Sequence, residues 1–299
     1  MLSIVVCSKN KILPKEFVDN ILNTVGVAYE IITIDNSENR YSIFSAYNQG
    51  VVKSKYPYIC FVHEDVFFHS VHWGEKVIAH LQNPKTGIIG LAGGDLITRV
   101  PASWSGFLSQ SKNITQSDRT GKVPTKTIRI PLNYNHSERS VIILDGVFMC
   151  MRRDLLDKIH FDEQLKGFHG YDFDISIQST IAGYANQVIY DVDLEHFSRG
   201  KTDMAYFRNL IAIFKKWETH LPLIDKNIPK EQLKEIPKIE NKNLTRLLKK
   251  MSRKGFDTTE ILTTITYYGN LIDKPSSIPC LKFRIFFIRL FNCPTYIFK

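Results

Sequence analysis

The sequence lacks any run of 18 or more apolar residues, which is the length that a membrane-spanning helix needs. It also lacks a charged leader, since the chain begins with MLSIVVCSKN, a segment typical of a β-strand rather than of a signal peptide. These two absences predict a protein that stays in the cytoplasm.

Two phosphate-binding motifs, GxGxxG and GxxxxGKS/T, are absent as well. Neither a dinucleotide nor a P-loop nucleotide is therefore expected in its usual glycine-rich cradle. The five cysteines include no CxxC pair, and Cys7, Cys60 and Cys150 lie inside apolar runs. Buried thiols fit this distribution better than disulfides or a zinc site.

The chain has 299 residues, 43% of them hydrophobic, which is enough for one α/β domain and an appendage. Its formal charge of +9 comes from the C-terminal end: residues 226–299 hold 15 Lys and Arg against 6 Asp and Glu, whereas residues 1–225 hold 24 of each. We expect a catalytic domain in residues 1–225 and a basic extension in residues 226–299. The extension should meet an anionic partner, either a membrane surface or a nucleic acid.

Strands and helices alternate in the first part of the sequence. Apolar runs at 2–7, 29–34 and 56–62 predict buried parallel strands, and the segments between them have the spacing of amphipathic helices. This order predicts an α/β fold with a mostly parallel central sheet flanked by helices and a Rossmann-like nucleotide half. Further strands are expected near 87–92, 141–151 and 188–192.

Polar residues follow each of the first three strands: Ser8-Lys9-Asn10, Asp35-Asn36-Ser37 and His63-Glu64-Asp65. Because the carboxyl ends of parallel strands meet at one edge of the sheet, we expect these side chains to line one crevice. A buried carboxylate needs a cation or hydrogen-bond donors, so Glu64 and Asp65 indicate a binding site.

A second group of polar residues lies in the middle of the chain. Asp145-Gly146 interrupts an apolar segment, and Gly170 frees the backbone before Tyr171 and Asp172, where a helix begins. A carboxylate at a helix start is stabilised as an anion. We therefore expect Asp172 to be unprotonated at neutral pH, as a general base must be.

Two further stretches carry candidate binding residues. Residues 93–140 form a long polar segment, which we interpret as an acceptor-side flap that includes Trp104. After the last strand come His196 and the cations Arg199 and Lys201, and cations of this kind suit a diphosphate.

The C-terminal part is expected to be mainly helical. Residues 227–242 look like a linker, and helices are expected at 244–254 and 258–268. The final segment, CLKFRIFFIRLFNCPTYIF, mixes aromatic and basic residues. It could lie on an anionic membrane face, dock on the domain, or dock on a second copy of the chain, and the sequence leaves these alternatives open.

The order of these motifs resembles the nucleotide half of family 2 glycosyltransferases of the GT-A fold. The resemblance covers residues 2–200 and is carried by Asp35, by AYNQGV at 46–51 and by YPYICFVHED at 56–65. In that family an Asn-x-Gly helix precedes a strand that ends in a DxD-type motif. The resemblance implies that Asp35 contacts uracil and that Asn48 supports the nucleotide site.

The same resemblance implies the remaining roles. Asp65 would bind a Mg²⁺ or Mn²⁺ ion, while His63 stands where the first Asp of the DxD pattern lies. His196 would complete the metal site, and Tyr171 replaces a Glu, which leaves Asp172 as the base. In all, we assign nucleotide binding to Ser8, Asn10, Asp35, Asn36, Asn48, His63 and Glu64; metal binding to Asp65 and His196; the sugars to Trp104, Asp145, Gly146 and Tyr171; and the diphosphate to Arg199 and Lys201.

These expectations predict an inverting, metal-dependent hexosyltransferase that moves a sugar from a UDP-sugar to a glycan or lipid-linked glycan in polysaccharide biosynthesis. A homodimer and contact with the inner membrane face are compatible with the basic extension. One alternative is a sugar-phosphate nucleotidyltransferase, although the first strand lacks the glycine-rich loop of that class. Another is a non-catalytic carbohydrate- or nucleic-acid-binding protein.

Overall fold

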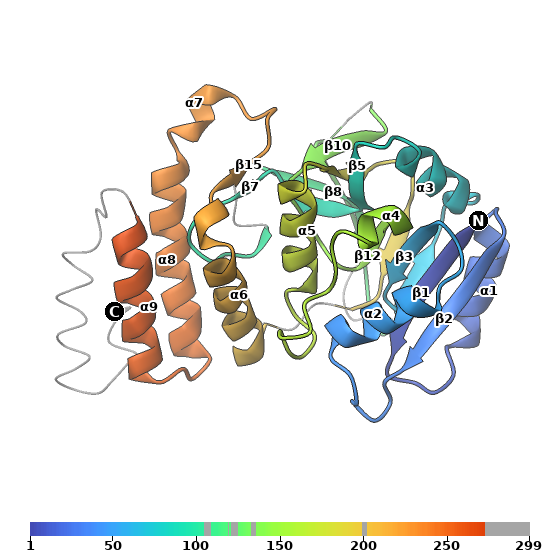
Figure 1. Ribbon diagram of the computed structural model, residues 1–299, viewed down its shortest axis with the longest axis horizontal. Helices are drawn as coiled ribbons and strands as arrows, with labels where there is room; N and C mark the ends of the chain where they lie inside the picture. Colours follow the sequence, from blue (N-terminus) through green and yellow to red (C-terminus); the bar gives the residue numbers. More distant parts are fainter. Residues whose placement is uncertain (105–108, 119, 121–124, 133–135, 199–201, 273–299) are drawn as a thin grey trace. The chain divides into compact units, whose positions relative to one another are not determined.

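The computed structural model describes residues 1–104, 109–118, 120, 125–132, 136–198 and 202–272. The chain begins with the predicted alternation, in the order β1 (Leu2–Ser8), α1 (Lys15–Thr24), β2 (Tyr29–Asp35), α2 (Ile43–Lys53) and β3 (Tyr58–Val62) (Figure 1). Ser42 caps the start of helix α2, because its hydroxyl accepts a hydrogen bond from the Ser45 backbone N–H. This cap satisfies one of the free amides of the first turn.

The main sheet has seven strands in the order β10-β13-β5-β12-β3-β1-β2. Its other members are β5 (Thr86–Gly90), β10 (Glu138–Val141), β12 (Phe148–Arg152) and β13 (Ala185–Ile189). Strands β1, β2 and β3 are parallel to one another, as are β5 and β13, whereas β12 and β10 are antiparallel to their neighbours. The prediction of a mostly parallel sheet flanked by helices is confirmed.

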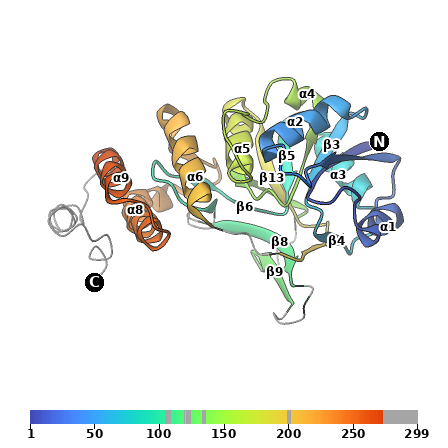
Figure 2. The ribbon, with the colours of Figure 1, turned by 90° about the horizontal axis from the view of Figure 1, so that it is seen from below.

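Helices cover both faces of this sheet (Figure 2). Helices α1 and α3 (Trp73–Leu81) pack on one face, and α2, α4 (Arg153–Leu156) and α5 (Tyr171–Ile181) on the other. Strand β1 shows the arrangement: Leu2, Ile4 and Val6 face the first cluster, while Val5 faces the second. A strand buried on both faces has no polar alternation, which is why it reads as a continuous apolar run.

Cys60 and Cys150 form a disulfide between β3 and β12. The prediction that these residues are free thiols was wrong. The antiparallel register of the two strands places Cys150 directly opposite Cys60. The sequence could not show this pairing, because the two cysteines are 90 positions apart in the chain. Strand β12 lies beside β3 in the sheet, although β4 to β11 separate the two strands in the sequence.

A second, smaller sheet lies beside the first. Its strands are β11 (Ile143–Leu144), β6 (Ala92–Gly94), β8 (Gln110–Gln116), β14 (Leu194–His196) and β4 (Val66–Phe68), with β9 (Lys126–Ile130) paired to β8. The reading of residues 93–140 as one long loop was therefore wrong in part. Strand β8 buries Ser111 and Asn113 rather than apolar side chains. Because the buried side chains of β8 are polar, the strand lacks the apolar alternation by which a strand is recognised in a sequence.

Among the described residues, those in the ranges 1–95 and 109–198 form one compact unit, and those in the ranges 96–104 and 202–272 form a second. The second unit contains β7 (Leu96–Ile97), α6 (Met204–Lys216), the 3₁₀ turn Glu218–His220, β15 (Leu223–Ile224), α7 (Lys230–Leu233), α8 (Ile236–Arg253) and α9 (Thr258–Leu271). The boundary expected between residues 225 and 226 falls inside this unit. The expectation of a mainly helical C-terminal part is confirmed.

Helices α6, α8 and α9 share a hydrophobic core that includes Phe207, Leu248 and Ile265. The guanidinium of Arg99 makes a two-pronged contact with the fully buried Glu240 on α8, at 2.8 and 3.0 Å. Part of the expected linker at 227–242 is helical, because Pro237 sits in the first turn of α8, where proline is tolerated.

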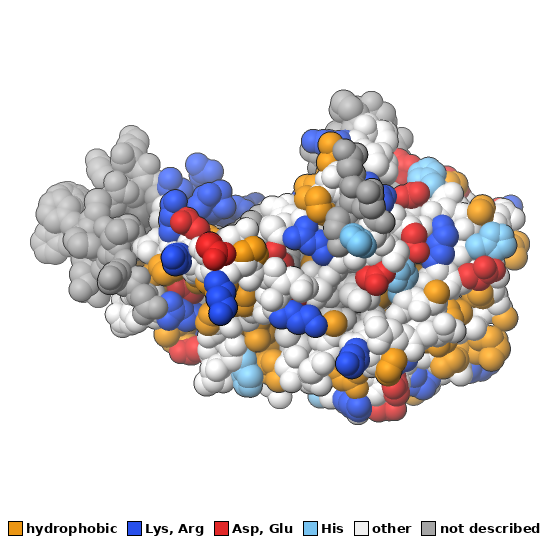
Figure 3. Space-filling model, turned by 90° about the horizontal axis from the view of Figure 1, so that it is seen from above, with side chains coloured by type: hydrophobic (Ala, Val, Ile, Leu, Met, Phe, Trp, Pro, Cys, Tyr) orange, Lys and Arg blue, Asp and Glu red, His pale blue; other side chains and the backbone are white. Residues whose placement is uncertain are grey.

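The basic character of the second unit is visible on its surface, where several Lys and Arg side chains lie close together (Figure 3). Among the described residues, no helix has the length and apolar character needed to cross a bilayer. The aromatic and basic segment at 280–298 lies outside the described residues.

Candidate functional site

The polar ends of β1 and β3 meet, as the sequence predicted. Glu64 is 8% exposed and accepts hydrogen bonds from the Ser8 hydroxyl at 2.5 Å and the Asn10 amide at 3.3 Å. The backbone N–H of Lys9 points at the same carboxylate, at 3.4 Å. Glu64 therefore shapes the turn after β1, and its charge is held by donors rather than left unpaired.

The end of β2 is held by its own side chains. The Asp35 carboxylate is exposed and accepts a hydrogen bond from the Ser37 backbone N–H at 2.9 Å, which lowers the pKa of Asp35. The buried Asn36 side chain is bonded at both ends to the backbone of Tyr41, at 2.9 and 3.0 Å. Asp35 is thus open to a ligand, whereas the Asn36 amide fixes the loop that presents it.

Asn48 points from α2 toward the segment before α5. Its amide nitrogen donates to the carbonyl of Phe161 and to the carboxylate of Glu163, both at 2.8 Å, and its oxygen accepts from the Phe161 N–H at 3.2 Å. Asn48 therefore joins the two halves of the domain. Its predicted support of the nucleotide site would therefore be indirect, because its hydrogen bonds are made to Phe161 and Glu163.

His63, Asp65 and His196 form a group in which each residue offers one ligand atom and these atoms lie within 4.8 Å of one another. His63 Nδ1 is 3.9 Å and His196 Nε2 is 3.5 Å from Asp65 Oδ1. Two residues come from the turn between β3 and β4, and the third from the end of β14. Two imidazoles and a carboxylate converging in this way could hold a divalent cation.

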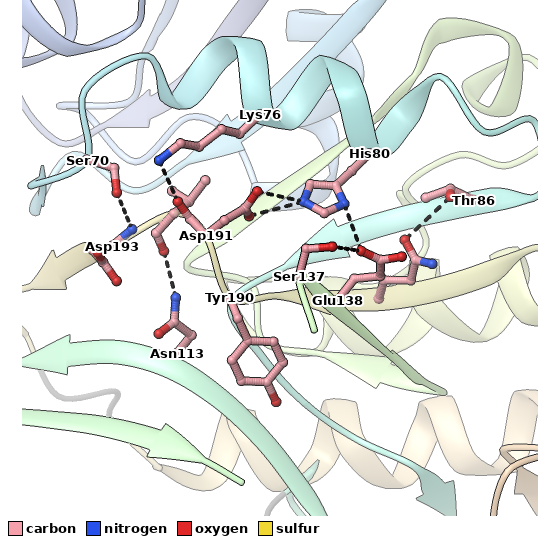
Figure 4. A network of polar contacts seen from close by, with 12 residues as sticks. Ser70, Lys76, His80, Thr86, Asn113, Ser137, Glu138, Tyr190, Asp191 and Asp193 are labelled. Carbon is pink, nitrogen blue, oxygen red and sulfur yellow. Dashed lines mark hydrogen bonds and ion pairs between the residues drawn. The ribbon is translucent and has the colours of Figure 1, made fainter. Parts of the chain in front are cut away.

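The position of His196 depends on the antiparallel pairing of β14 with β4, which places His196 opposite Val66. The turn before β14 is anchored by a polar network (Figure 4). Lys76 Nζ donates to the Asp191 carbonyl at 2.7 Å, Asn113 to the Val192 carbonyl at 2.8 Å, and the Asp193 N–H to Ser70 at 2.8 Å.

The same network contains His80, which lies between the carboxylates of Asp191, at 3.0 Å, and Glu138, at 3.4 Å. Although burial by itself raises the pKa of the Asp191 carboxyl, the hydrogen bond from His80 brings it below its ordinary value. These contacts hold residues 191–193 in place just before β14, and thereby help to set the position of His196 at the end of that strand. Nothing in the sequence pattern signals this network.

Tyr171 connects the histidine cluster to the start of α5. Its hydroxyl donates to the Gly146 carbonyl at 3.0 Å and lies 2.8 Å from His63 Nε2. Because a carbonyl can only accept, the hydroxyl proton is used on Gly146, and His63 Nε2 carries the hydrogen that faces the tyrosine oxygen. The lone pair of His63 Nδ1 then faces Asp65. Tyr171 thus orients His63 in the way that an outer hydrogen-bond partner orients a metal ligand.

Gly146 is required for this contact. A Cβ atom at Gly146 would lie 2.2 Å from the Tyr171 hydroxyl oxygen, a distance that only movement of the ring could relieve. The residue before Tyr171, Gly170, has a φ of +87°, which favours glycine and turns the chain into α5. These two glycines place the tyrosine hydroxyl beside His63.

The charges at the cluster favour cation binding. Burial alone raises the pKa of Asp65, but hydrogen bonds from His196 and Ser198 and the nearby His63 hold it well below its ordinary value. The pKa of His63 is lowered, first by burial and then by the neighbouring His196. An ionised carboxylate beside neutral imidazole is the protonation state that a metal ion needs.

Asp172 behaves in the opposite way. Burial, and then repulsion by Asp145, raise the pKa of its carboxyl to about 7. The prediction that the helix start keeps Asp172 fully ionised at neutral pH was wrong. Hydrogen bonds from the Phe173, Asp172 and Gly146 backbone amides lower the pKa, but they do not offset burial and the second carboxylate.

The family described as "Glycosyltransferase like family" matches residues 3–198. The chain belongs to this family. The match covers the whole segment that carries the resemblance found in the sequence, from β1 to the residues after His196. The recognition of a glycosyltransferase is thereby confirmed.

Two similar proteins illustrate the range of relatives. "ATP synthase subunits region ORF 6" of Fuscovulum blasticum is 26% identical over 198 residues, which are 64% of this chain and 73% of that protein. Among solved structures, that of GalNAc-T7 with UDP, GalNAc and Mn²⁺ is 13% identical with a TM-score of 0.47. That match covers 79% of this chain and about half, 53%, of the GalNAc-T7 chain.

The structure of this glycosyltransferase brings most of the predicted site residues into its first unit. Trp104 belongs to the second unit, and its contact with a sugar stays a prediction. Arg199 and Lys201 lie outside the described residues, so their contact with a diphosphate also stays a prediction. His63, predicted to contact the nucleotide, is one of the three residues that could hold a metal ion, and its contact with a nucleotide stays a prediction.

Proposed function

We propose that this protein is an inverting glycosyltransferase that moves a sugar from a UDP-sugar to a hydroxyl group of a glycan acceptor. Family membership supports glycosyl transfer in general. The observation that supports the specific assignment is the 2.8 Å contact between His63 Nε2 and the Tyr171 hydroxyl. This contact places the group of His63, Asp65 and His196 next to the start of α5, where Asp172 would accept a proton.

The cation would be held by His63, Asp65 and His196. Magnesium prefers oxygen ligands and strict octahedral geometry, whereas manganese accepts imidazole more readily, so this donor set favours Mn²⁺ over Mg²⁺. When bound, the cation would neutralise charge on the departing diphosphate. Tyr171 would hold the His63 ring in the orientation that ligation needs.

Asp172 would act as the general base. In the transfer, the acceptor oxygen forms a bond to the anomeric carbon while the bond from that carbon to the diphosphate oxygen breaks. The proton of the acceptor hydroxyl passes to the ionised Asp172 carboxylate. Its pKa of about 7 suits this step, because a base is most effective when its pKa is near the working pH.

The nucleotide would bind where β1, β2 and β3 end. Asp35 presents an exposed carboxylate able to accept hydrogen bonds from the base, while Glu64, Ser8 and Asn10 keep the adjoining turn in place. The acceptor would be a glycan or a lipid-linked glycan in the cytoplasm. Trp104, Arg199 and Lys201 are proposed to contact the sugars and the diphosphate.

Calorimetric titration of UDP with and without Mn²⁺ tests donor binding. We expect UDP to bind much more tightly with Mn²⁺, and we expect this gain to disappear in Asp65→Asn but to remain in the control Asp157→Asn, which changes an exposed carboxylate. Equal UDP affinity with and without the metal would contradict the proposed site.

NMR of the first product formed from an α-linked UDP-sugar tests the stereochemistry. A β-linked product is expected from direct attack opposite the leaving group. An α-linked product would refute the inverting mechanism while leaving glycosyl transfer intact. Release of pyrophosphate from UTP and a sugar phosphate would instead identify a nucleotidyltransferase.

A further inference from the structure

The second unit contains a pocket of about 300 Å³ between α6, α8 and the segment 101–103. Four cations line it, all from α8: Arg246, Lys249, Lys250 and Arg253. Their spacing of three, four and seven residues places them on one side of the helix. No Asp or Glu is among the residues that line the pocket.

The remaining wall of the pocket is largely apolar. Phe207 and Leu210 from the first half of α6 contribute to it, and Lys250 Nζ lies 5.9 Å from the centre of the Phe207 ring. The buried face of α8, with Leu247 and Leu248, belongs to the core of the unit. Cations and apolar surface therefore meet on one side of one helix, an arrangement that suits an amphiphilic anion.

Asn243 supplies a second, independent observation. It lines the same pocket and is 1% exposed, yet its Oδ1 atom has no hydrogen-bond partner among the described residues. Its amide nitrogen donates only weakly, to Thr98 at 3.4 Å. A buried acceptor without a donor is unfavourable, so a ligand hydroxyl that donated a hydrogen bond to Asn243 Oδ1 would stabilise this site.

We propose that this pocket binds the headgroup of an anionic, hydroxyl-bearing phospholipid at a membrane surface. The phosphate contacts the Arg246 and Lys250 side of α8, a headgroup hydroxyl donates to Asn243, and the lipid chains continue past Ala102 and Tyr206, which are partly exposed in the wall of the pocket. This site is distinct from the proposed transferase site and does not depend on it.

Two other occupants fit less well. The C-terminal residues 274–299 contain Lys and Arg but no Asp or Glu, so they carry the same sign of charge as the pocket. A single-stranded nucleic acid would stack several bases on aromatic faces, and of the two aromatic residues that line the pocket Phe207 is buried and only Tyr206 is partly exposed. A membrane lipid satisfies the cations, the apolar wall and the orphan acceptor together.

Co-sedimentation of the full chain with vesicles tests the proposal. Vesicles of phosphatidylcholine with phosphatidylglycerol are expected to bind the protein, and pure phosphatidylcholine vesicles are not. The double variant Arg246→Gln with Lys250→Gln should lower the affinity about 30-fold, since each cation near an anionic surface contributes about a factor of five. Arg246→Lys with Lys250→Arg keeps the charges and should bind as the natural chain does.

The matched control is Lys230→Gln with Lys234→Gln, which removes two exposed cations of the same unit outside the pocket. If this control loses as much affinity as the pocket variant, attraction is by overall charge and the proposal fails. Unchanged binding of the pocket variant, or tighter binding of an oligonucleotide than of the vesicles, also overturns it.

The role of Asn243 is tested with phosphatidylmethanol, which has the charge of phosphatidylglycerol but no headgroup hydroxyl. The natural chain should prefer phosphatidylglycerol about fivefold, as expected for one hydrogen bond. Asn243→Ala should abolish the preference. Binding of inorganic phosphate as tight as that of the vesicles would show an anion site without a lipid role and would refute the proposal.

Discussion

Asp65 lies beside His63, and Asp172 follows Tyr171, whose hydroxyl contacts that histidine, yet the pKa values of the two carboxyls shift in opposite directions. Asp65 is next to His63 and His196, and its pKa is held low. Asp172 is next to Asp145, and its pKa rises to about 7. Both are partly buried, and burial raises the pKa of each. Hydrogen bonds from His196 and Ser198 reverse this shift at Asp65, whereas repulsion by Asp145 adds to it at Asp172.

This difference suits the separate tasks proposed for the two carboxyls. A carboxylate that stays ionised at every physiological pH can hold a cation, but it cannot release and take up protons during a reaction. A carboxyl with a pKa near 7 can exchange its proton with an acceptor hydroxyl. The two environments are joined by the hydrogen bond between His63 and Tyr171, which allows the comparison to be tested one residue at a time.

Asp172→Asn should have the largest effect on activity. It removes the proton acceptor but keeps the shape of the side chain, so kcat is expected to fall about 10³-fold to 10⁴-fold. UDP binding with Mn²⁺ should not change. Initial rates together with calorimetry check this, and a variant with nearly natural kcat would exclude Asp172 as the base.

Asp65→Asn and His196→Gln should each lower activity about 10²-fold to 10³-fold, because the cation loses one of three ligands. In contrast to Asp172→Asn, these variants should also lose Mn²⁺ affinity, which titration calorimetry measures in the presence of UDP. Retained Mn²⁺ binding in both variants would place the cation elsewhere.

Tyr171→Phe separates the His63 contact from the ligands themselves. Loss of the hydroxyl frees the His63 ring to adopt either tautomer, so we expect Mn²⁺ affinity to fall about 10-fold to 100-fold. Tyr184→Phe is a suitable control, since the Tyr184 hydroxyl contacts Lys158 away from the cluster. Identical metal affinity in the Tyr171 variant and the control would show that the contact has no positioning role.

Asp145→Asn should change the pH dependence more than the maximal rate. Activity of the natural chain should rise as the pH passes through about 7, because the ionised Asp172 is the base. Without the Asp145 charge the pKa of Asp172 falls, so the acid limb of the kcat profile should move down by about one pH unit. An unmoved limb would mean that burial alone sets this pKa.

The smallest expected effect is on stability. The raised pKa of Asp172 means that the folded state binds a proton more tightly than the unfolded chain, so this contribution is complete below about pH 4 and is lost as the pH rises through about 7. Asp172→Asn does not titrate, so it avoids this loss of stability above about pH 7. Its Tm should therefore exceed that of the natural chain at pH 8 but not at pH 4, as measured by calorimetry.

Much of the first unit could be predicted from the sequence, because local patterns encode it. Strands β1 and β3 are buried on both faces and read as apolar runs, and the polar residues after them mark the edge of the sheet where Ser8, Asn10 and Glu64 meet. The family resemblance rested on these same stretches, and the family match confirmed it.

The tertiary structure alone decided which distant residues became neighbours. Antiparallel pairing of β14 with β4 brings His196 to Asp65, and pairing of β12 with β3 joins Cys150 to Cys60. The pKa of Asp172 was mispredicted for the same reason. A helix start is a local feature that the sequence displays, whereas burial and an opposing carboxylate arise only when separate segments of the chain come together.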